Sequence, residues 1–197
     1  MKTLFVMIVA ALLYATVARA GEQLALGANA PAFSLVSAAD GTTVEMKPND
    51  GFIKVVVFTS NGCPVSTDFE PRLIEIANRY GHRGIRFYAV NSSDPVRNHD
   101  ESLQAMKARA EELEYPFPYL KDTNGSVAAA YGAHVTPHVF VVDGDGKVRY
   151  RGAIDDSAKP AERKVTGLTN ALNGLTDGRE VGTPDTVAFG CPIPSKN

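Results

Sequence analysis

The sequence has little cysteine and no surplus of basic residues, and both shortages narrow the range of functions. Its 197 residues include two cysteines. That number is too small for a structural zinc site with four cysteine ligands, but it is enough for one disulfide. Lys and Arg together number 20 against 22 Asp and Glu, which gives a net charge of −2. Because nucleic-acid binding relies on basic side chains that neutralise phosphates, this balance argues against nucleic acid as a main partner.

Internal repeats and low-complexity tracts are also missing, and the one long apolar run lies at the N-terminus. Hydrophobic residues make up 44% and charged residues 21% of the chain, as in an ordinary globular domain and unlike a disordered or fibrous protein. Residues 1–20 combine a basic start, an apolar run over 4–17 and the small–x–small sequence Ala18-Arg19-Ala20. These features predict a signal peptide that is cleaved after Ala20.

Cleavage would leave residues 21–197 as one domain with a tail over 179–197, in the periplasm or outside the cell. The apolar run is shorter than the roughly 20 residues that a membrane-spanning helix needs. If the segment stayed uncleaved, it would be the chain's only expected contact with a membrane. Export implies a compartment in which disulfides form and persist, and both cysteines, Cys63 and Cys191, belong to the exported part.

The rest of the chain alternates predicted strands and helices. Apolar periodicity predicts strands at 32–36, 42–46, 53–58, 85–90, 139–142 and 147–154, and helices over 64–80, from 103 to before Pro116, over 126–131 and over 165–175. This order predicts an α/β domain with a central mixed β-sheet flanked by helices, an N-terminal β-hairpin and an extended C-terminal tail. Several folds share this order, so the choice among them depends on motifs.

The first motif surrounds Cys63. A buried strand ends at Phe58, the turn 59–62 follows, and Cys63-Pro64 begins a helix. Proline suits the first helical turn, and the free N–H groups there favour a thiolate over a thiol. We therefore expect Cys63 to be an accessible nucleophile, with hydroxyl donors to its sulfur from Ser66, Thr59 and Ser60. The alternative is that Cys63 is one half of a structural disulfide.

The second motif is Val135-Thr136-Pro137, just before the predicted strand 139–142. Together with Cys63-Pro64-Val65-Ser66 it resembles the thioredoxin superfamily, and within it the redoxin branch of AhpC/TSA proteins and exported thiol–disulfide oxidoreductases. The resemblance runs from about Leu26 to the C-terminus. It includes the opening segment 27–35, the stretch 150–156 and the tail 190–194.

This resemblance implies a thioredoxin-like fold in which Pro137 is cis and lies beside the active cysteine. Thr136 would then present its backbone to a substrate peptide, and Pro64 would line the same groove. The resemblance also implies activity without a cofactor. The expected partners are thiol or disulfide proteins, or a small peroxide, together with a redox donor protein.

Two departures from the family patterns affect the expected reaction. Ser66 stands where a Cys-x-x-Cys motif has its second cysteine, and Val56 stands where the peroxidatic motif has proline, although Ser60 keeps the hydroxyl three residues before Cys63. Thiol–disulfide exchange is therefore favoured over peroxide reduction. Cys191 either resolves a mixed disulfide or sulfenic acid or only clamps the tail. A non-catalytic binding module with a structural Cys63–Cys191 disulfide also remains open.

The histidines indicate no metal site. Among the four, only His134 and His138 have i,i+4 spacing, and these two flank the Thr-Pro turn instead of lying on one helix face. Asp155-Asp156 follows a predicted strand and is expected to form a turn or to begin a helix.

Overall fold

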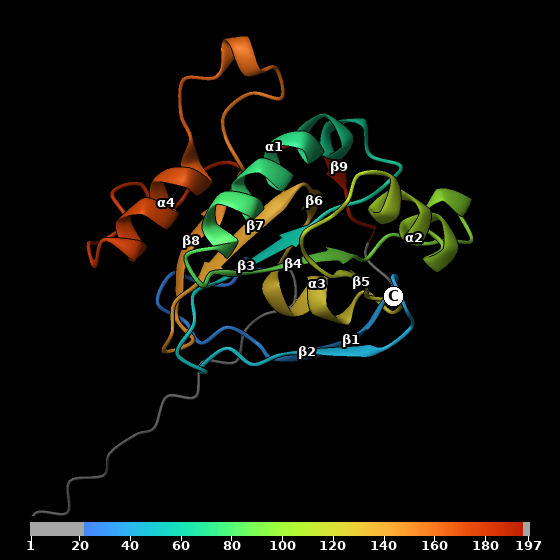
Figure 1. Ribbon diagram of the computed structural model, residues 1–197, viewed down its shortest axis with the longest axis horizontal. Helices are drawn as coiled ribbons and strands as arrows, with labels where there is room; N and C mark the ends of the chain where they lie inside the picture. Colours follow the sequence, from blue (N-terminus) through green and yellow to red (C-terminus); the bar gives the residue numbers. More distant parts are fainter. Residues whose placement is uncertain (1–21, 195–197) are drawn as a thin grey trace, which may run out of the picture.

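A computed structural model describes residues 22–194 of the chain (Figure 1). The predicted signal peptide, with its cleavage after Ala20, lies outside the described residues. Within the described part, no helix is both long enough and apolar enough to cross a membrane.

The described residues form a seven-stranded mixed sheet and a small two-stranded one. The strands are β1 Phe33–Ser37, β2 Thr43–Met46, β3 Lys54–Phe58, β4 Arg86–Asn91, β5 Tyr119–Lys121, β6 Val135–Thr136, β7 His138–Val142, β8 Val148–Gly152 and β9 Cys191–Pro192; the α-helices are α1 Pro64–Gly81, α2 Leu103–Glu112, α3 Ser126–Tyr131 and α4 Gly167–Thr176. The large sheet has the order β2-β1-β5-β4-β3-β7-β8, and β6 pairs with β9. Strand β4 runs parallel to β3 and β5, whereas β7 runs antiparallel to β3. The predicted fold class is therefore confirmed.

The sheet divides the hydrophobic core into two layers because its central strands are buried on both faces. Val55 and Val57 of β3 face one layer, which α1 and α4 cover, and Val56 and Phe58 face the other, which contains α3 and the β1–β2 hairpin. Figure 1 shows α1 above the central strands β3 and β4, α3 below these two strands, and α4 beside β8. Alternate residues of a strand point to opposite faces, so an unbroken apolar run such as β3 requires this two-sided cover.

Strand β5 is the one strand of the large sheet that the sequence patterns did not predict. It has three residues, Tyr119–Lys121, which is too short for a periodic signal. It lies between β1 and β4, with Val36 of β1 opposite Lys121 and Ala89 of β4 opposite Tyr119. It thereby joins the N-terminal hairpin to the central strands.

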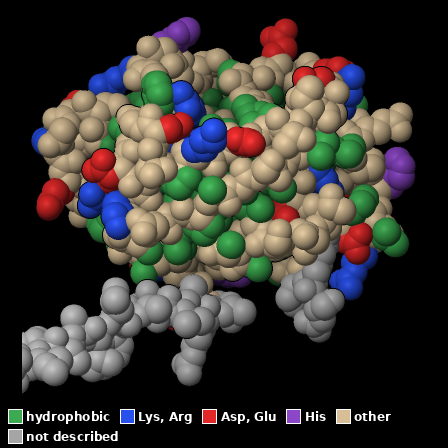
Figure 2. Space-filling model, turned by 90° about the horizontal axis from the view of Figure 1, so that it is seen from below, with side chains coloured by type: hydrophobic (Ala, Val, Ile, Leu, Met, Phe, Trp, Pro, Cys, Tyr) green, Lys and Arg blue, Asp and Glu red, His purple; other side chains and the backbone are tan. Residues whose placement is uncertain are grey.

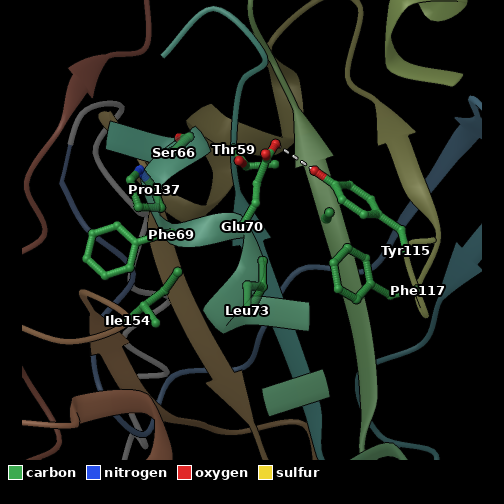
Figure 3. Close-up of a pocket in the computed structure, with 10 residues that line it drawn as sticks. Thr59, Ser66, Phe69, Glu70, Leu73, Tyr115, Phe117, Pro137 and Ile154 are labelled. Carbon is green, nitrogen blue, oxygen red and sulfur yellow. Dashed lines mark hydrogen bonds between the residues drawn. The ribbon is translucent and has the colours of Figure 1, made fainter. Parts of the chain in front are cut away.

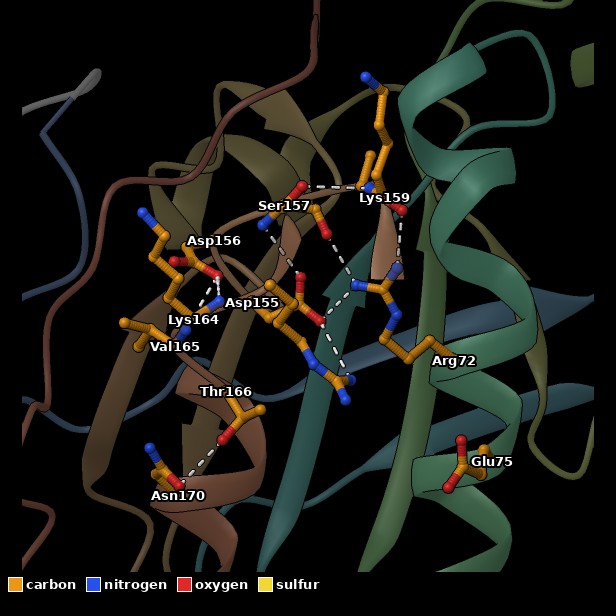
Figure 4. Close-up of polar contacts among 12 residues, drawn as sticks. Arg72, Glu75, Asp155, Asp156, Ser157, Lys159, Lys164, Val165, Thr166 and Asn170 are labelled. Carbon is orange, nitrogen blue, oxygen red and sulfur yellow. Dashed lines mark hydrogen bonds and ion pairs between the residues drawn. The ribbon is translucent and has the colours of Figure 1, made fainter. Parts of the chain in front are cut away.

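A buried ion pair holds the loop between β8 and α4 against α1 (Figure 4). The Arg72 guanidinium pairs with the Asp155 carboxylate, and it also donates to the carbonyl oxygens of Ser157 at 2.8 Å and Ala158 at 2.7 Å. Asp156 accepts from backbone N–H groups just before α4. The Asp155-Asp156 pair is thus a turn and helix-start feature, which is the role that the sequence predicted.

Charged side chains of both signs are mixed on the surface. Figure 2 shows basic and acidic side chains interspersed over the face that it presents. Exposed pairs such as Arg79–Glu75 and Arg83–Asp177 place opposite charges side by side.

The Arg72→Met substitution tests the buried ion pair. It should lower the free energy of unfolding by about 3–5 kcal/mol, because it leaves the Asp155 carboxylate buried without its main partner. The matched control is Arg79→Met, which removes an exposed pair on the same helix and should cost less than about 1 kcal/mol. Urea denaturation of the oxidised proteins measures both values. Equal losses for the two variants would contradict a special role for the buried pair.

Candidate active site

Cys63 occupies the N-cap of α1, directly after the turn that follows β3. Its backbone is extended (φ −96°, ψ 110°), and its sulfur accepts from the backbone N–H of Ser66 at an N–S distance of 3.4 Å. Pro64 takes the first helical position and is exposed. The sulfur therefore lies where unpaired N–H groups and the helix dipole stabilise negative charge, so the chemistry predicted for this position is physically available.

The Thr136–Pro137 peptide bond is cis, as predicted, and it lies against Cys63. The Cys63 sulfur is 3.1 Å from the carbonyl oxygen of Thr136. The two segments meet because β3 and β7 are antiparallel neighbours in which Phe58 lies opposite His138. The turn after β3 and the residues just before β7 therefore reach the same end of the sheet.

Cys63 forms a disulfide with Cys191 on the C-terminal tail. Their Cα atoms are 5.8 Å apart across a sequence separation of 128. Strand β9 pairs antiparallel with β6, so that Cys191 lies opposite Thr136. Cys63 is 0% exposed. The expectation of an accessible sulfur is therefore wrong for this oxidised state, in which Cys191 and its strand lie against Cys63.

The three predicted hydroxyl donors do not all face the sulfur. The Ser60 hydroxyl donates to the Glu101 carboxylate at 2.6 Å, so its predicted contact with the sulfur is wrong. Ser66 approaches the sulfur with its backbone N–H, and its hydroxyl is buried without a hydrogen-bond partner among residues 22–194. Thr59 is buried and lines a small cavity behind the cysteine.

Glu101 supports the turn before Cys63, and the sequence analysis did not identify it. Its carboxylate is buried and accepts from the Ser60 hydroxyl, from the Gly62 backbone N–H at 2.8 Å and from the Asn91 amide at 2.6 Å. A Cβ atom on Gly62 would lie 2.8 Å from Glu101 Oε1 and 2.2 Å from Asn98 Nδ2. A side chain on Gly62 would therefore have to displace the Asn98 amide and the Glu101 carboxylate, and that carboxylate holds the turn through several hydrogen bonds. Nothing in the local sequence distinguishes Glu101 from the acidic residues around it.

The cavity behind Cys63 lies between α1, β4 and the cis-proline (Figure 3). It is lined by Thr59, Ser66, Phe69, Glu70, Leu73, Ala89, Tyr115, Phe117, Pro137 and Ile154. The Glu70 carboxylate is buried and accepts from the Tyr115 hydroxyl at 2.7 Å and from Arg109. Burial, followed by the hydrogen bond to Glu70, raises the pKa of Tyr115. The cavity volume is about 10 Å³, which is room for about one water molecule and not for a substrate.

His138 follows the cis-proline and is fully buried. Burial, followed by the charges of His134 and Arg151, lowers the pKa of His138 to about 3. Its ring lies 4.6 Å from the Phe140 ring, and its two ring nitrogens have no hydrogen-bond partner in the part of the chain that the structure describes. His138 is therefore neutral at physiological pH and packs as an aromatic ring.

The sequence of this chain is similar to a known protein family and to named oxidoreductases. The AhpC/TSA family matches residues 26–151. The thiol-disulfide oxidoreductase ResA of Bacillus thuringiensis subsp. konkukian is 27% identical over 127 residues, which cover 64% of this chain and 69% of ResA. The family match includes Cys63 and the cis-proline but ends before Cys191.

Solved structures share the fold. An uncharacterized conserved protein from Geobacillus kaustophilus superposes with a TM-score of 0.81 at 38% identity, covering 86% of this chain and 91% of its own. The thioredoxin domain of a thiol-disulfide oxidoreductase from Bacteroides vulgatus superposes with a TM-score of 0.53 at 24% identity, covering 64% of this chain and 86% of its own. The fold expected from the sequence motifs is therefore confirmed as thioredoxin-like.

The Glu101→Gln substitution tests the support of the turn. It should lower the free energy of unfolding by about 2–4 kcal/mol, because it weakens charge-assisted hydrogen bonds and places an NH₂ group against other donors. Glu111→Gln is the control, since Glu111 forms only an exposed pair with Lys107 on α2. Denaturant unfolding of the oxidised proteins measures both. A loss no greater than that of the control would show that the turn does not depend on Glu101.

The buried His138 predicts a pH dependence of stability. Between pH 6.5 and about 3 the unfolded chain binds a proton at this residue and the folded chain does not, so stability falls as the pH falls through that window. From pH 7 to pH 5 the loss from this group is about 2 kcal/mol. His138→Phe should remove this part of the loss, whereas His82→Phe, at an exposed position, should retain it. Denaturant titrations at the two pH values provide the comparison.

Proposed function

The chain belongs to the AhpC/TSA family of the thioredoxin-like superfamily, and on that premise we propose that it is an exported thiol–disulfide oxidoreductase with Cys63 as its nucleophile. One observation carries the proposal. Cys63 lies at the start of α1, is bonded to a second cysteine and contacts the segment with the cis-proline. A helix N-terminus stabilises the thiolate that exchange requires, and a disulfide between two cysteines of the enzyme is the state in which a round of such exchange would leave them.

The reaction transfers two electrons from the two cysteines to a substrate disulfide. The Cys63 thiolate attacks one substrate sulfur, which forms a mixed disulfide and releases the other substrate sulfur as a thiolate. The Cys191 thiolate then attacks the Cys63 sulfur, which forms the Cys63–Cys191 disulfide and releases the second substrate thiolate. A dithiol donor protein returns the two electrons and becomes a disulfide itself.

Cys191 fits the resolving role because Ser66 cannot perform it. A serine hydroxyl does not form a disulfide, so the second sulfur has to come from outside the first turn of α1. Cys191 is the other cysteine of the chain, and its Cα lies 5.8 Å from that of Cys63.

Peroxide reduction is the related alternative, since a sulfenic acid on Cys63 would condense with Cys191 to the same disulfide and release water. Two features place it second. Val56 replaces the proline of the peroxidatic motif, and the Ser60 hydroxyl donates to Glu101 in place of facing the sulfur.

The non-enzymatic alternative is a binding module in which the Cys63–Cys191 disulfide only holds the tail in place as a structural clamp. The complete burial of Cys63 favours this alternative. Reduction potential separates the two roles. A clamp should have a potential below about −300 mV, whereas catalytic pairs lie higher. Equilibration of the Cys63–Cys191 pair in redox buffers therefore tests the rival directly.

Export is the remaining part of the proposal. It rests on the signal-peptide pattern of residues 1–20 and on the presence of a disulfide, which persists in the periplasm or outside the cell and is rare in the cytosol. The expected partners there are proteins with exposed disulfides and a dithiol donor.

Cysteine variants of the chain without residues 1–20 test the catalytic role. Cys63→Ser should lower insulin disulfide reduction to the uncatalysed rate of dithiothreitol alone, because the remaining thiol, Cys191, does not lie at a helix start that would stabilise its thiolate. Cys191→Ser should lower turnover at least tenfold and accumulate a mixed disulfide that mass spectrometry detects. Hydrogen peroxide consumption by the same variants identifies the peroxidase alternative. Full insulin reduction by Cys63→Ser would exclude the proposed mechanism.

A further inference from the structure

The C-terminal strand lies at the edge beside the cis-proline, where an extended peptide would reach Cys63. Cys191 lies opposite Thr136 and Pro192 opposite Val135 in antiparallel register. The Ile193 N–H donates to the His134 carbonyl at 2.8 Å and continues the pairing. The tail thus adds a strand to the β6 edge and places its own cysteine sulfur on Cys63.

Gly190, the residue before Cys191, allows the tail backbone to lie close to Thr136 and Pro137. Its φ is +147°, and a Cβ atom built on it would lie 1.9 Å from the Thr136 carbonyl oxygen and 3.3 Å from Pro137 Cδ. The nearest obstacle is backbone, which cannot move aside as a flexible side chain would. A side chain at this position would therefore keep the strand out of the groove, in addition to straining its backbone.

We propose, on the basis of the proposed function, that the tail is an internal substrate mimic and that the groove selects extended cysteine peptides with glycine before the cysteine. The tail and a substrate peptide require the same backbone edge at Thr136 and the same sulfur of Cys63. The tail and the substrate peptide therefore exclude one another from the groove.

Thr186 attaches the tail to β8, and the proposed exchange involves the segment 187–194 that follows it. The Thr186 hydroxyl is 2.7 Å from the Tyr150 hydroxyl, and the Thr186 N–H donates to the Arg151 carbonyl at 3.1 Å. Val187, the next residue, is 86% exposed. Beyond it, Phe189 packs against Phe69 with ring centroids 5.9 Å apart. The segment 187–194 is thus held by the disulfide, by the short pairing with residues 134–136 and by a few apolar contacts, whereas Thr186 is bonded to β8.

This arrangement couples resolution of the mixed disulfide to product release. When the tail returns, the Cys191 thiolate attacks the Cys63 sulfur, a new S–S bond forms and the substrate sulfur leaves as a thiolate. The same movement returns the tail to the Thr136 edge, which displaces the substrate backbone. One strand exchange therefore breaks both the covalent and the hydrogen-bonded attachment of the product.

Peptide coupling tests the selectivity of the groove. In the Gly190→Ala/Cys191→Ser variant the tail can neither seat nor form the disulfide, so Cys63 is free. The probes are the peptide of residues 186–194, joined to glutathione through its cysteine, and the same peptide with alanine in place of glycine. At equilibrium the glycine peptide should form at least tenfold more mixed disulfide with Cys63 than the alanine peptide. Equal coupling would overturn the inference and leave the proposed function intact, whereas coupling of neither peptide would overturn both.

The single Gly190→Ala substitution tests whether the pairing of the tail with Thr136 depends on this glycine. It should shift the equilibrium between the Cys63–Cys191 disulfide and reduced glutathione at least tenfold toward the dithiol, which is about 30 mV in potential. Gly182→Ala is the matched control, because no atom lies within 4 Å of its added Cβ. Equal melting temperatures of the reduced proteins would show that the fold is retained. An unchanged equilibrium in Gly190→Ala would overturn the inference.

Discussion

The antiparallel pairing of β3 with β7 is the constraint on which the rest of the site depends. Phe58, the last residue of β3, lies opposite His138, the first residue of β7. This register brings the turn that ends at Cys63 against the cis-proline at Pro137. Both strands are buried on both faces, so a slip by one residue would exchange their contacts with the two core layers. The hydrophobic core therefore determines the geometry of the sulfur.

Buried polar groups then hold the loops around this end of the sheet. Glu101 accepts hydrogen bonds from the turn before Cys63, and Arg72 with Asp155 fastens the loop that follows β8. Each of these charges is buried and has close partners, as the cost of removing a charge from water requires. The turn before Cys63 is thus held by buried hydrogen bonds, whereas the tail that carries Cys191 is joined to it by the disulfide and a short strand pairing.

Much of this architecture follows from patterns within a few residues of one another. Period-two alternation and apolar runs predicted six of the strands, and glycine and proline marked the ends of α1 and α2. Strand β5 was not predicted because three residues carry no period. Glu101 was not predicted because its partners in the turn before Cys63 lie some forty residues away in the sequence. The hydroxyl of Ser60 was assigned to the sulfur for the same reason. Such contacts join segments that are far apart in the sequence, and no local sequence pattern describes which of these segments pack together.

By itself, the sequence determined that Cys63 begins a helix after a buried strand and that Thr136-Pro137 precedes another. It also left Cys191 as the only partner for an intramolecular disulfide. The tertiary structure decided that the tail enters the groove, that Cys63 is buried in the oxidised state and that Gly190 lies too close to Thr136 to bear a side chain. The reason is physical. Helix starts and strand periods are set by neighbouring residues, whereas burial and strand addition are set by segments that only packing brings together.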